Sequence, residues 1–281
     1  MPRLFVFGLG FCGRTIARRL AAQGWEVAGT TRSGDVADVP GLRPYPFDAD
    51  HALPDDALEG VTHILSSVPP GPDGDPVLTR MAPRLAALAP AWVGYLSTTG
   101  VYGDRGGAWV DEESELRPDL DRSRRRADAE RAWMASGLPV HVFRLGGIYG
   151  PGRSAIDTVR AGKARRIVKP GQVFGRIHVE DVAATVAASI NRPRPGAVYN
   201  VVDDDPAPPQ DVIFHACTLL GIEPPPEVSW DEAKATLSPM ALSFYADNKR
   251  VGNDRIKSEL GVRLTYPDYR AGLAAILAES R

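Results

Sequence analysis

The stretch RLFVFGLGFCGRTIARRLAAQG, residues 3–24, decides the fold. It opens with a short apolar run that ends in glycine, which is typical of a buried strand. Apolar side chains then recur at helical spacing until Gly24 ends the pattern; they are Ile16, Ala17, Leu20 and Ala21. The stretch therefore predicts a strand, a glycine-rich turn and a helix, in that order.

The same alternation continues along the first half of the chain. Further strands are predicted at residues 25–31, 62–68 and 92–98, with the end of another at 45–48, and residues 139–150 predict a strand that runs into a loop. Helices are predicted between them, at 76–89, where Pro83 is expected to kink or split the helix, and at 121–130. Because parallel neighbours need a crossover connection, strands separated by helices predict an α/β fold with a doubly wound parallel sheet.

Beyond Gly150 the alternation of strands and helices becomes less regular. Residues 178–190 predict a helix that packs back on the sheet, residues 197–203 predict a further strand, and two or three helical segments follow. The stretch KARRIVKPG at 163–171 has two interpretations, a loop that faces a substrate together with Arg176, or a hairpin exposed to water.

The composition excludes several classes of protein. Hydrophobic residues make up 43% of the 281 residues and charged residues 24%, and the net charge is −2. This balance is ordinary for a globular protein and indicates neither nucleic acid nor a membrane as a partner. The sequence shows no signal peptide and no membrane span, so a cytoplasmic protein is expected. Cys12 and Cys217 are too few for a disulfide framework or a structural zinc site, and no metal site is predicted.

Gly8, Gly10 and Gly13 give the spacing G-x-G-x-x-G directly after the first predicted strand. The first glycine allows a tight turn, the second lets the backbone approach a pyrophosphate, and the third lets the helix pack close to the strand. Phosphates would then lie at the positive end of the helix, beside the amides of Phe11 and Cys12. The strand-turn-helix context favours a dinucleotide site over a turn that binds nothing.

The end of the second strand bears on the choice of cofactor. Residues 30–33 are TTRS, where an NAD site would place an acid for the ribose 2′-hydroxyl. Thr31 and Arg32 instead suit a 2′-phosphate, so NADP is favoured over NAD. The alternatives are that Arg32 is only solvated, or that the nearby Asp35 binds the ribose. Asp48 has two interpretations as well, a contact to the adenine amino group or an exposed turn aspartate.

Four motifs stand in one order along the chain: GLGFCG at 8–13, STTGVYGD at 97–104, FRLGGIYGPGR at 143–153 and RIHVEDVA at 176–183. With them the chain resembles the extended short-chain dehydrogenases/reductases, the superfamily of NAD(P)-dependent nucleotide-sugar epimerases and dehydratases.

The resemblance implies a Rossmann-type domain and a smaller, mainly C-terminal α+β substrate lobe with the site between them. Residues 1–150 with about 178–203 would form the first, and 151–177 with 204–281 the second. A small-molecule substrate and, by analogy with the family, a homodimer are expected.

The family's chemistry uses a Ser or Thr, a Tyr, and a Lys four residues after the Tyr. Alignment on the motifs places Thr98 at the hydroxyl position, Arg122 at the tyrosine position and Arg126 at the lysine position. No tyrosine occurs between Tyr102 and Tyr149, so the helix lacks the usual phenol in any register. Arginine keeps the cation, and Arg126 is expected to bind ribose hydroxyls of the cofactor, but it does not donate a proton near neutral pH.

Three hypotheses follow. In the first, Tyr102, Tyr149 or His178 replaces the phenol, although each tyrosine has a structural alternative and His178 an alternative as a helix cap. In the second, Arg122 or a neighbour polarises a carbonyl or clamps an anionic substrate, while Thr98 and water manage the proton. In the third, the protein is a non-catalytic sensor or scaffold that binds NAD(P). An NADP-linked oxidoreductase or epimerase-like enzyme is the favoured function.

The remaining candidate positions concern the cofactor and the arginine-rich helix. Backbone and small hydroxyl groups near the ends of three strands are expected to contact the dinucleotide, at Ser67, Val68, Ser97, Gly146 and Ile148. For Ser67 and Val68 the alternative is a turn that contacts no ligand. Arg124 and Arg125 are expected to form a solvated helix face that pairs with Asp121 and Asp128.

Overall fold

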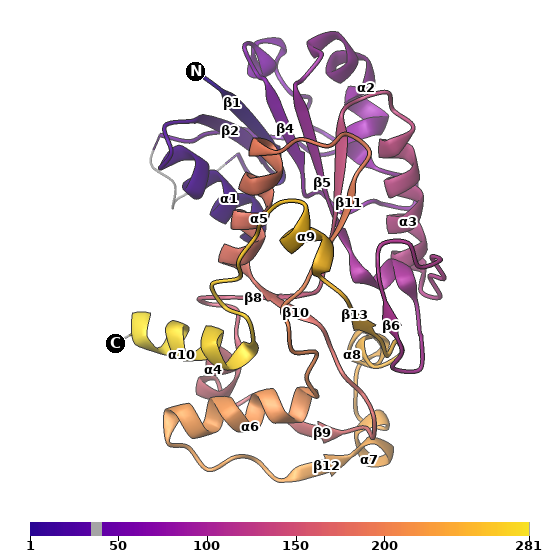
Figure 1. Cartoon of the computed structure of the whole chain (residues 1–281), viewed down its shortest axis with the longest axis vertical. Helices are drawn as coiled ribbons and strands as arrows, with labels where there is room; N and C mark the ends of the chain where they lie inside the picture. Colours follow the sequence, from indigo (N-terminus) through magenta and orange to yellow (C-terminus); the bar gives the residue numbers. More distant parts are fainter. Residues whose placement is uncertain (35–40, 281) are drawn as a thin grey trace.

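The computed structural model describes residues 1–34 and 41–280. Seven parallel strands form the central sheet, in the order β11-β7-β5-β4-β1-β2-β3 (Figure 1). Their bounds are β1 Arg3–Phe7, β2 Glu26–Thr31, β3 Arg43–Pro46, β4 His63–Ser66, β5 Trp92–Thr98, β7 Val140–Leu145 and β11 Val198–Val201. The predicted doubly wound parallel sheet is confirmed.

Side chains of β1 alternate between two layers of core. Leu4 and Val6 pack with one cluster, whereas Phe5 and Phe7 pack with another on the opposite face of the sheet. The first cluster contains side chains of α1 (Phe11–Ala21) and α5 (Val179–Asn191). The second contains side chains of α2 (Pro76–Leu88) and α3 (Asp121–Met134). The buried sheet therefore has helices on both faces, as its near-continuous apolar strands require.

Some local features differ from the sequence-based expectation. Helix α2 continues through Pro83 and is not split there. The ring of Pro83 is exposed, and proline inside a helix costs the bond of its missing N–H, which the packing of Val77, Met81 and Leu85 outweighs. In residues 139–150 the strand is β7, and the segment expected as a loop contains the short strand β8 (Gly147–Tyr149).

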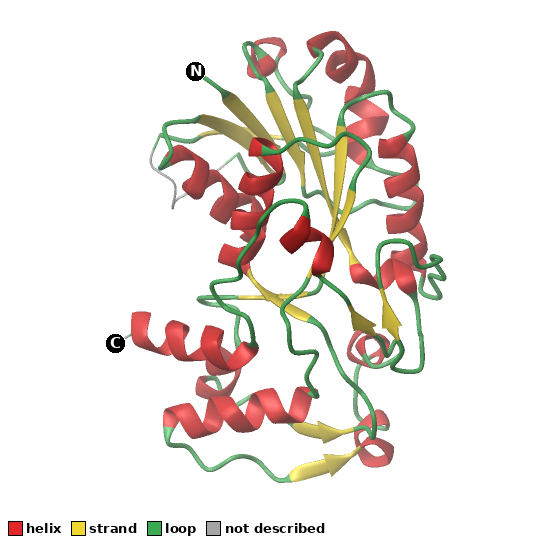
Figure 2. Cartoon of the chain, viewed as in Figure 1, coloured by secondary structure: helices red, strands yellow, loops and turns green. Residues whose placement is uncertain are grey.

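The smaller lobe lies below the sheet in Figure 1 and is mainly helical, as Figure 2 shows. Its helices are α4 Ala155–Arg160, α6 Pro209–Leu220, α7 Trp230–Lys234, α8 Pro239–Phe244 and α10 Tyr269–Glu279. A separate cluster of buried side chains, including Ile156, Ala216 and Leu273, joins α4, α6 and α10. Strand β9 (Arg166–Val168) pairs in parallel with β12 (Glu227–Ser229), so the hairpin interpretation of residues 163–171 is wrong.

Two short pairs of parallel strands lie between the sheet and the smaller lobe in Figure 1. Strand β8 pairs with β10 (Arg176–His178), and β6 (Trp109–Val110) pairs with β13 (Arg250–Val251). The 3-10 helix η1 (Asp55–Leu58) follows β3, η2 (Thr99–Tyr102) follows β5, and α9 (Asp254–Ser258) follows β13. The division into two domains at the boundaries given above stays a prediction. No helix in the described part of the chain is long and apolar enough to cross a bilayer.

Candidate active site

Each of the three glycines in the turn between β1 and α1 has a different steric environment. Gly8 has φ +91°, a backbone conformation that side chains disfavour. A Cβ on Gly13 would lie 2.3 Å from the carbonyl oxygen of Gly8, so the helix packs against the strand there as the motif requires. A Cβ on Gly10 would meet nothing within 4 Å. The space in front of Gly10 is therefore open, which fits the approach of a pyrophosphate.

Residues of β2 and of the segment directly after β4 form hydrogen bonds with this turn. The Leu9 N–H donates to the Thr30 carbonyl at 2.7 Å, and the Gly8 N–H donates to Thr30 Oγ1 at 3.0 Å. Ser67 Oγ donates to the Gly8 carbonyl at 2.6 Å. Gly10 is the N-cap of α1 and no side chain caps the helix, so the first amides of α1 remain for a ligand. The structure thus places Ser67 and Val68 beside the turn, where the sequence predicted cofactor contacts.

The end of β2 lies next to this turn. Arg32 is exposed, and Thr31 Oγ1 accepts a hydrogen bond from the Gly34 N–H at 2.8 Å. Asp35 lies outside the described residues. Asp48 Oδ1 accepts from the backbone of Asp50 and His51, each at 2.9 Å, and these bonds with the His51 ring hold the pKa of Asp48 below its usual value. This geometry favours the turn-aspartate interpretation of Asp48.

A cleft of about 1100 Å³ opens beyond the carboxyl ends of β5 and β7 and extends between the sheet and the smaller lobe. Thr98, Gly146 and Ile148 line it, as do side chains from α3, α4 and α8. Its charged lining is strongly cationic, with seven basic residues, Arg122, Arg126, Arg153, Lys163, Arg165, Arg176 and Lys249, and two acidic ones, Asp157 and Asp247. Such a cleft attracts anionic ligands.

Arg122 and Arg126 both reach this cleft from α3. Arg126 Nη1 donates to the Leu96 carbonyl at 2.5 Å, and its guanidinium lies over the Tyr95 ring. Arg122 lies over the ring of Phe244 in α8, 4.7 Å from its centroid, and Nη2 donates to the Ser243 carbonyl at 3.3 Å. In the described residues neither guanidinium has a carboxylate within 4 Å, which leaves both charges available to a substrate.

The other arginines of α3 face away from the cleft. Arg124 pairs with Asp121 at 2.6 Å, as expected. Asp128 pairs with Arg131 instead of Arg125, so that part of the predicted pairing is wrong; the three-residue spacing brings Asp128 and Arg131 together one turn further along the helix.

The side chains of the neighbouring residues Thr98 and Ser97 point in different directions. Thr98 lines the cleft, and its Oγ1 accepts from the Gly100 N–H at 3.1 Å. Ser97 is buried, and its hydroxyl donates to the carboxylate of Glu130. Glu130 also binds the buried guanidinium of Arg144 at 2.9 Å. The hydroxyl of Ser97 therefore serves a buried ion pair and is not directed at a cofactor.

Tyr102 belongs to the same buried network. Its side chain is fully buried; the hydroxyl donates to Asn200 Oδ1 at 2.7 Å and accepts from Arg144 Nη1 at 2.9 Å. Burial also raises the pKa of Tyr102. A phenol with both hydrogen-bonding positions engaged inside the protein has no access to a reacting carbonyl, which agrees with the structural alternative for Tyr102.

His178 and Tyr149 lie together at the boundary of the lobe. His178 is the N-cap of α5, and its Nδ1 accepts from the Glu180 N–H at 3.3 Å. Burial lowers the pKa of His178 to about 4, so the ring is neutral near pH 7. The Tyr149 hydroxyl donates to the Asp268 carbonyl at 3.3 Å and packs against Gly272 of α10. Both side chains have the structural contacts that the sequence left as alternatives.

Comparisons with known proteins agree with this geometry. The chain is 30% identical to Protein YeeZ of Escherichia coli K12 over 95% of its own length and 97% of that protein. A functionally unknown conserved protein from Silicibacter pomeroyi is 52% identical, with a TM-score of 0.89 over 100% of this chain and 99% of that one. A putative NAD-dependent epimerase/dehydratase from Methylobacillus flagellatus is 27% identical, with a TM-score of 0.76 over 99% and 98%. The chain belongs to the epimerase/dehydratase family.

This extended short-chain dehydrogenase/reductase is an atypical one, because α3 contains neither a tyrosine nor a lysine. Over 52% of its length it is also 31% identical to half of a 3-diazoavenalumate denitrifying reductase from Streptomyces. Structures of MoeE5 with NAD and of human epimerase family protein SDR39U1 with NADPH, both 21% identical, share the fold with TM-scores of 0.79 and 0.71. No protein-family profile matches the sequence.

Sequence reasoning on this family member missed several residues of the cleft. Lys249 is 7% exposed, and its Nζ donates to the Gly103 carbonyl at 2.8 Å and pairs with Asp247 at 3.1 Å. Burial lowers the pKa of Lys249. Arg153 is a second such residue, and the available signal was the turn sequence PGR at 151–153 in which it lies. For Lys249 no local pattern indicates the cleft, because Gly103, to whose carbonyl it donates, lies 146 residues away along the chain.

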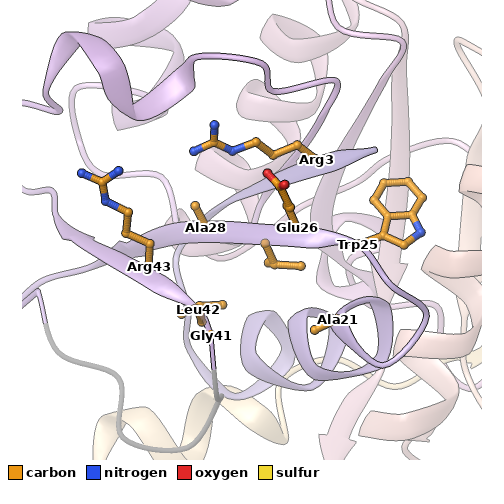
Figure 3. Close-up of a pocket in the computed structure, with 9 residues that line it drawn as sticks. Arg3, Ala21, Trp25, Glu26, Ala28, Gly41, Leu42 and Arg43 are labelled. Atoms are coloured by element: carbon orange, nitrogen blue, oxygen red, sulfur yellow. The ribbon is translucent and has the colours of Figure 1, made fainter. Parts of the chain in front are cut away.

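A second hollow, of about 420 Å³, lies at the amino ends of β1, β2 and β3 (Figure 3). Arg3, Glu26 and Arg43, which line it, are the first residues of β1, β2 and β3. Ligands of parallel sheets bind beyond the carboxyl ends of the strands. The cleft at β5 and β7, and not this hollow, is therefore the candidate site.

Proposed function

We propose that the protein is an NADP-linked oxidoreductase or epimerase-like enzyme that acts on a small anionic substrate without the usual tyrosine. The observation that carries the proposal is the cationic cleft beyond Thr98 together with the open space at Gly10 of the glycine turn. Arg153, which lines the cleft, lies over the ring of Phe11 at the start of α1. The relatives' names support oxidoreductase chemistry in general and not one reaction.

The cofactor would be held at the turn by main-chain amides of Phe11 and Cys12 at the start of α1. When bound, a nicotinamide dinucleotide supplies or accepts the hydride. Exposed Arg32 beside Thr31 supports NADP, since a guanidinium binds a 2′-phosphate that a carboxylate would repel.

The substrate's anionic group would bind between Arg122 and Arg126. The two residues are four apart on α3, so their side chains extend from one face of the helix. Two guanidinium groups held by carbonyl oxygens and aromatic rings, without carboxylate partners in the described residues, favour a carboxylate or phosphate ligand. They would also stabilise negative charge that develops on a reacting carbonyl oxygen.

Proton transfer would pass through the Thr98 hydroxyl and water. Tyr102 and His178 are buried and hydrogen-bonded, so neither supplies an accessible acid at neutral pH. Thr98 already lines the cleft, and its Oγ1 accepts a bond from the Gly100 amide, which leaves its proton free to donate. Because an alcohol is a weak acid, the hydroxyl would act as a relay that gives its proton to the developing alkoxide of the substrate as it takes one from water.

The test uses purified protein, NADPH and a panel of carbonyl compounds that do or do not carry a carboxylate or phosphate. Turnover is expected with anionic members. Thr98→Val should lower kcat and leave the affinity for NADPH unchanged. Arg122→Met should raise KM or lower kcat for the anionic substrate, whereas Arg125→Met, on the exposed face of the same helix, should change neither. Binding of NADPH without turnover of any panel member would favour a non-catalytic sensor.

A further inference from the structure

Arg153 connects the smaller lobe to the glycine turn. Its guanidinium lies over the ring of Phe11, 5.6 Å from the centroid, and Phe11 is the first residue of α1. The same arginine lines the large cleft. One side chain therefore lies between the substrate cleft and the turn where a diphosphate would bind.

The backbone around Arg153 is fixed against the same helix. Gly150 and Arg153 exchange two main-chain hydrogen bonds, of 3.1 and 3.0 Å, which close a tight turn with Gly152 at φ +75°. A Cβ on Gly150 would lie 3.1 Å from Phe11 Cζ and 2.7 Å from Val179 Cγ1. The turn thus packs directly on the beginning of α1 and on the beginning of α5, and the position of Arg153 is set by backbone.

The charge of Arg153 is available at this place. The side chain is exposed, and within residues 1–34 and 41–280 it has no carboxylate within 4 Å. Burial raises the pKa of the Cys12 thiol to about 11, and the positive charge of Arg153 acts in the opposite direction, which places the guanidinium near the second residue of α1. A cation without a counter-ion beside free helix amides is suited to an anion.

We infer that Arg153 binds the diphosphate of the dinucleotide from the substrate lobe, opposite the glycine turn. This inference rests on the proposed function, because it requires that a dinucleotide binds at all. The glycine turn supplies amides from one side and Arg153 supplies the cation from the other. Cofactor binding would then also hold the turn at residues 150–153, and with it the start of the lobe.

The experiment measures NADP⁺ affinity of the full chain by isothermal titration calorimetry. Arg153→Ala should weaken binding about 10- to 100-fold, the range for a lost charge-assisted hydrogen bond. Arg153→Lys should recover part of the loss, since it keeps the cation but not the forked geometry. The loss should shrink at high salt because the interaction is charged and exposed. Arg165→Ala is the matched control, since Arg165 lines the same cleft but precedes β9 at the far end of the lobe.

Thermal unfolding without cofactor serves as the folding control, and all variants should unfold at the wild-type temperature. Unchanged NADP⁺ affinity in Arg153→Ala, or an equal loss in Arg165→Ala, would overturn the role of Arg153 while leaving the proposed function intact. A raised substrate KM with unchanged NADP⁺ affinity would also overturn it and would assign Arg153 to the substrate. If the wild-type protein binds no pyridine nucleotide, the proposed function itself fails.

Discussion

Gly10→Ala tests the cofactor site without disturbing the fold. Within the glycine turn, Gly10 faces the open space where a cofactor would bind, whereas Gly13 packs closely against backbone. The backbone at Gly10 has φ −78° and ψ −160°, which alanine adopts without strain. Its added methyl group would meet no atom within 4 Å. The free protein should therefore tolerate the change, and it gains about 0.4–1 kcal/mol where the loss of glycine reduces the entropy of the unfolded chain.

The bound state should respond differently. If a diphosphate occupies the open space at Gly10, the methyl group competes for that space. Overpacking of this kind costs about 1–3 kcal/mol, which corresponds to a loss of affinity of about 5- to 150-fold. Gly13→Ala should show the opposite pattern. Its Cβ would lie 2.3 Å from a backbone oxygen, so the fold itself should lose stability.

Two measurements on both variants decide the matter, the free energy of unfolding in urea without cofactor and the dissociation constant for NADP⁺. The expected result is stability equal to or slightly above that of the wild type with weak binding for Gly10→Ala, and reduced stability for Gly13→Ala. Wild-type affinity in a well-folded Gly10→Ala protein would refute the placement of the diphosphate at this turn.

Three further outcomes are expected. Arg32→Asp should weaken NADP⁺ much more than NAD⁺ in fluorescence titrations; equal effects would remove the 2′-phosphate assignment. Glu130→Ala should cost about 3–5 kcal/mol in urea unfolding, since it leaves the buried guanidinium of Arg144 unpaired, and a loss under 1 kcal/mol would contradict that. Burial raises the pKa of Asp203 to about 8, so the folded chain holds a proton there that the unfolded chain releases above about pH 4, and stability falls as pH rises from 4 to 8. Asp203→Asn should accordingly be more stabilising at pH 8 than at pH 4, and a pH-independent difference would argue against the shift.

The sequence predicts the sheet well because its signals are local. Alternation of apolar strands with helices, and the glycine spacing of the first turn, are both readable within about thirty residues. Of the two expectations for Pro83, a kink or a split, the split is wrong, because the continuity of α2 depends on the packing of its opposite face, which no local pattern reports.

The site is less predictable because its contacts join distant residues. Tyr102 reads as a candidate acid until its partners Arg144 and Asn200 appear, and these lie on β7 and β11. Arg153 is likewise hard to assign from the sequence, because Phe11, the residue it contacts, lies far away along the chain. In contrast, the cleft-facing pair Arg122 and Arg126 follows from helical spacing alone once α3 is known to border the cleft.

The order of the strands has a consequence for how this chain is made and how it is re-engineered. Strand β11 pairs with β7, yet the residues of α4, β9 and β10 are synthesised between them. A nascent chain therefore carries an unpaired sheet edge at β7 until residue 201 has left the ribosome, and such edges recruit other chains. With the bounds expected above, a hybrid that exchanges the smaller lobe for that of a relative needs three splice junctions, near residues 150, 178 and 203, because α5 and β11 lie between the two segments of the lobe.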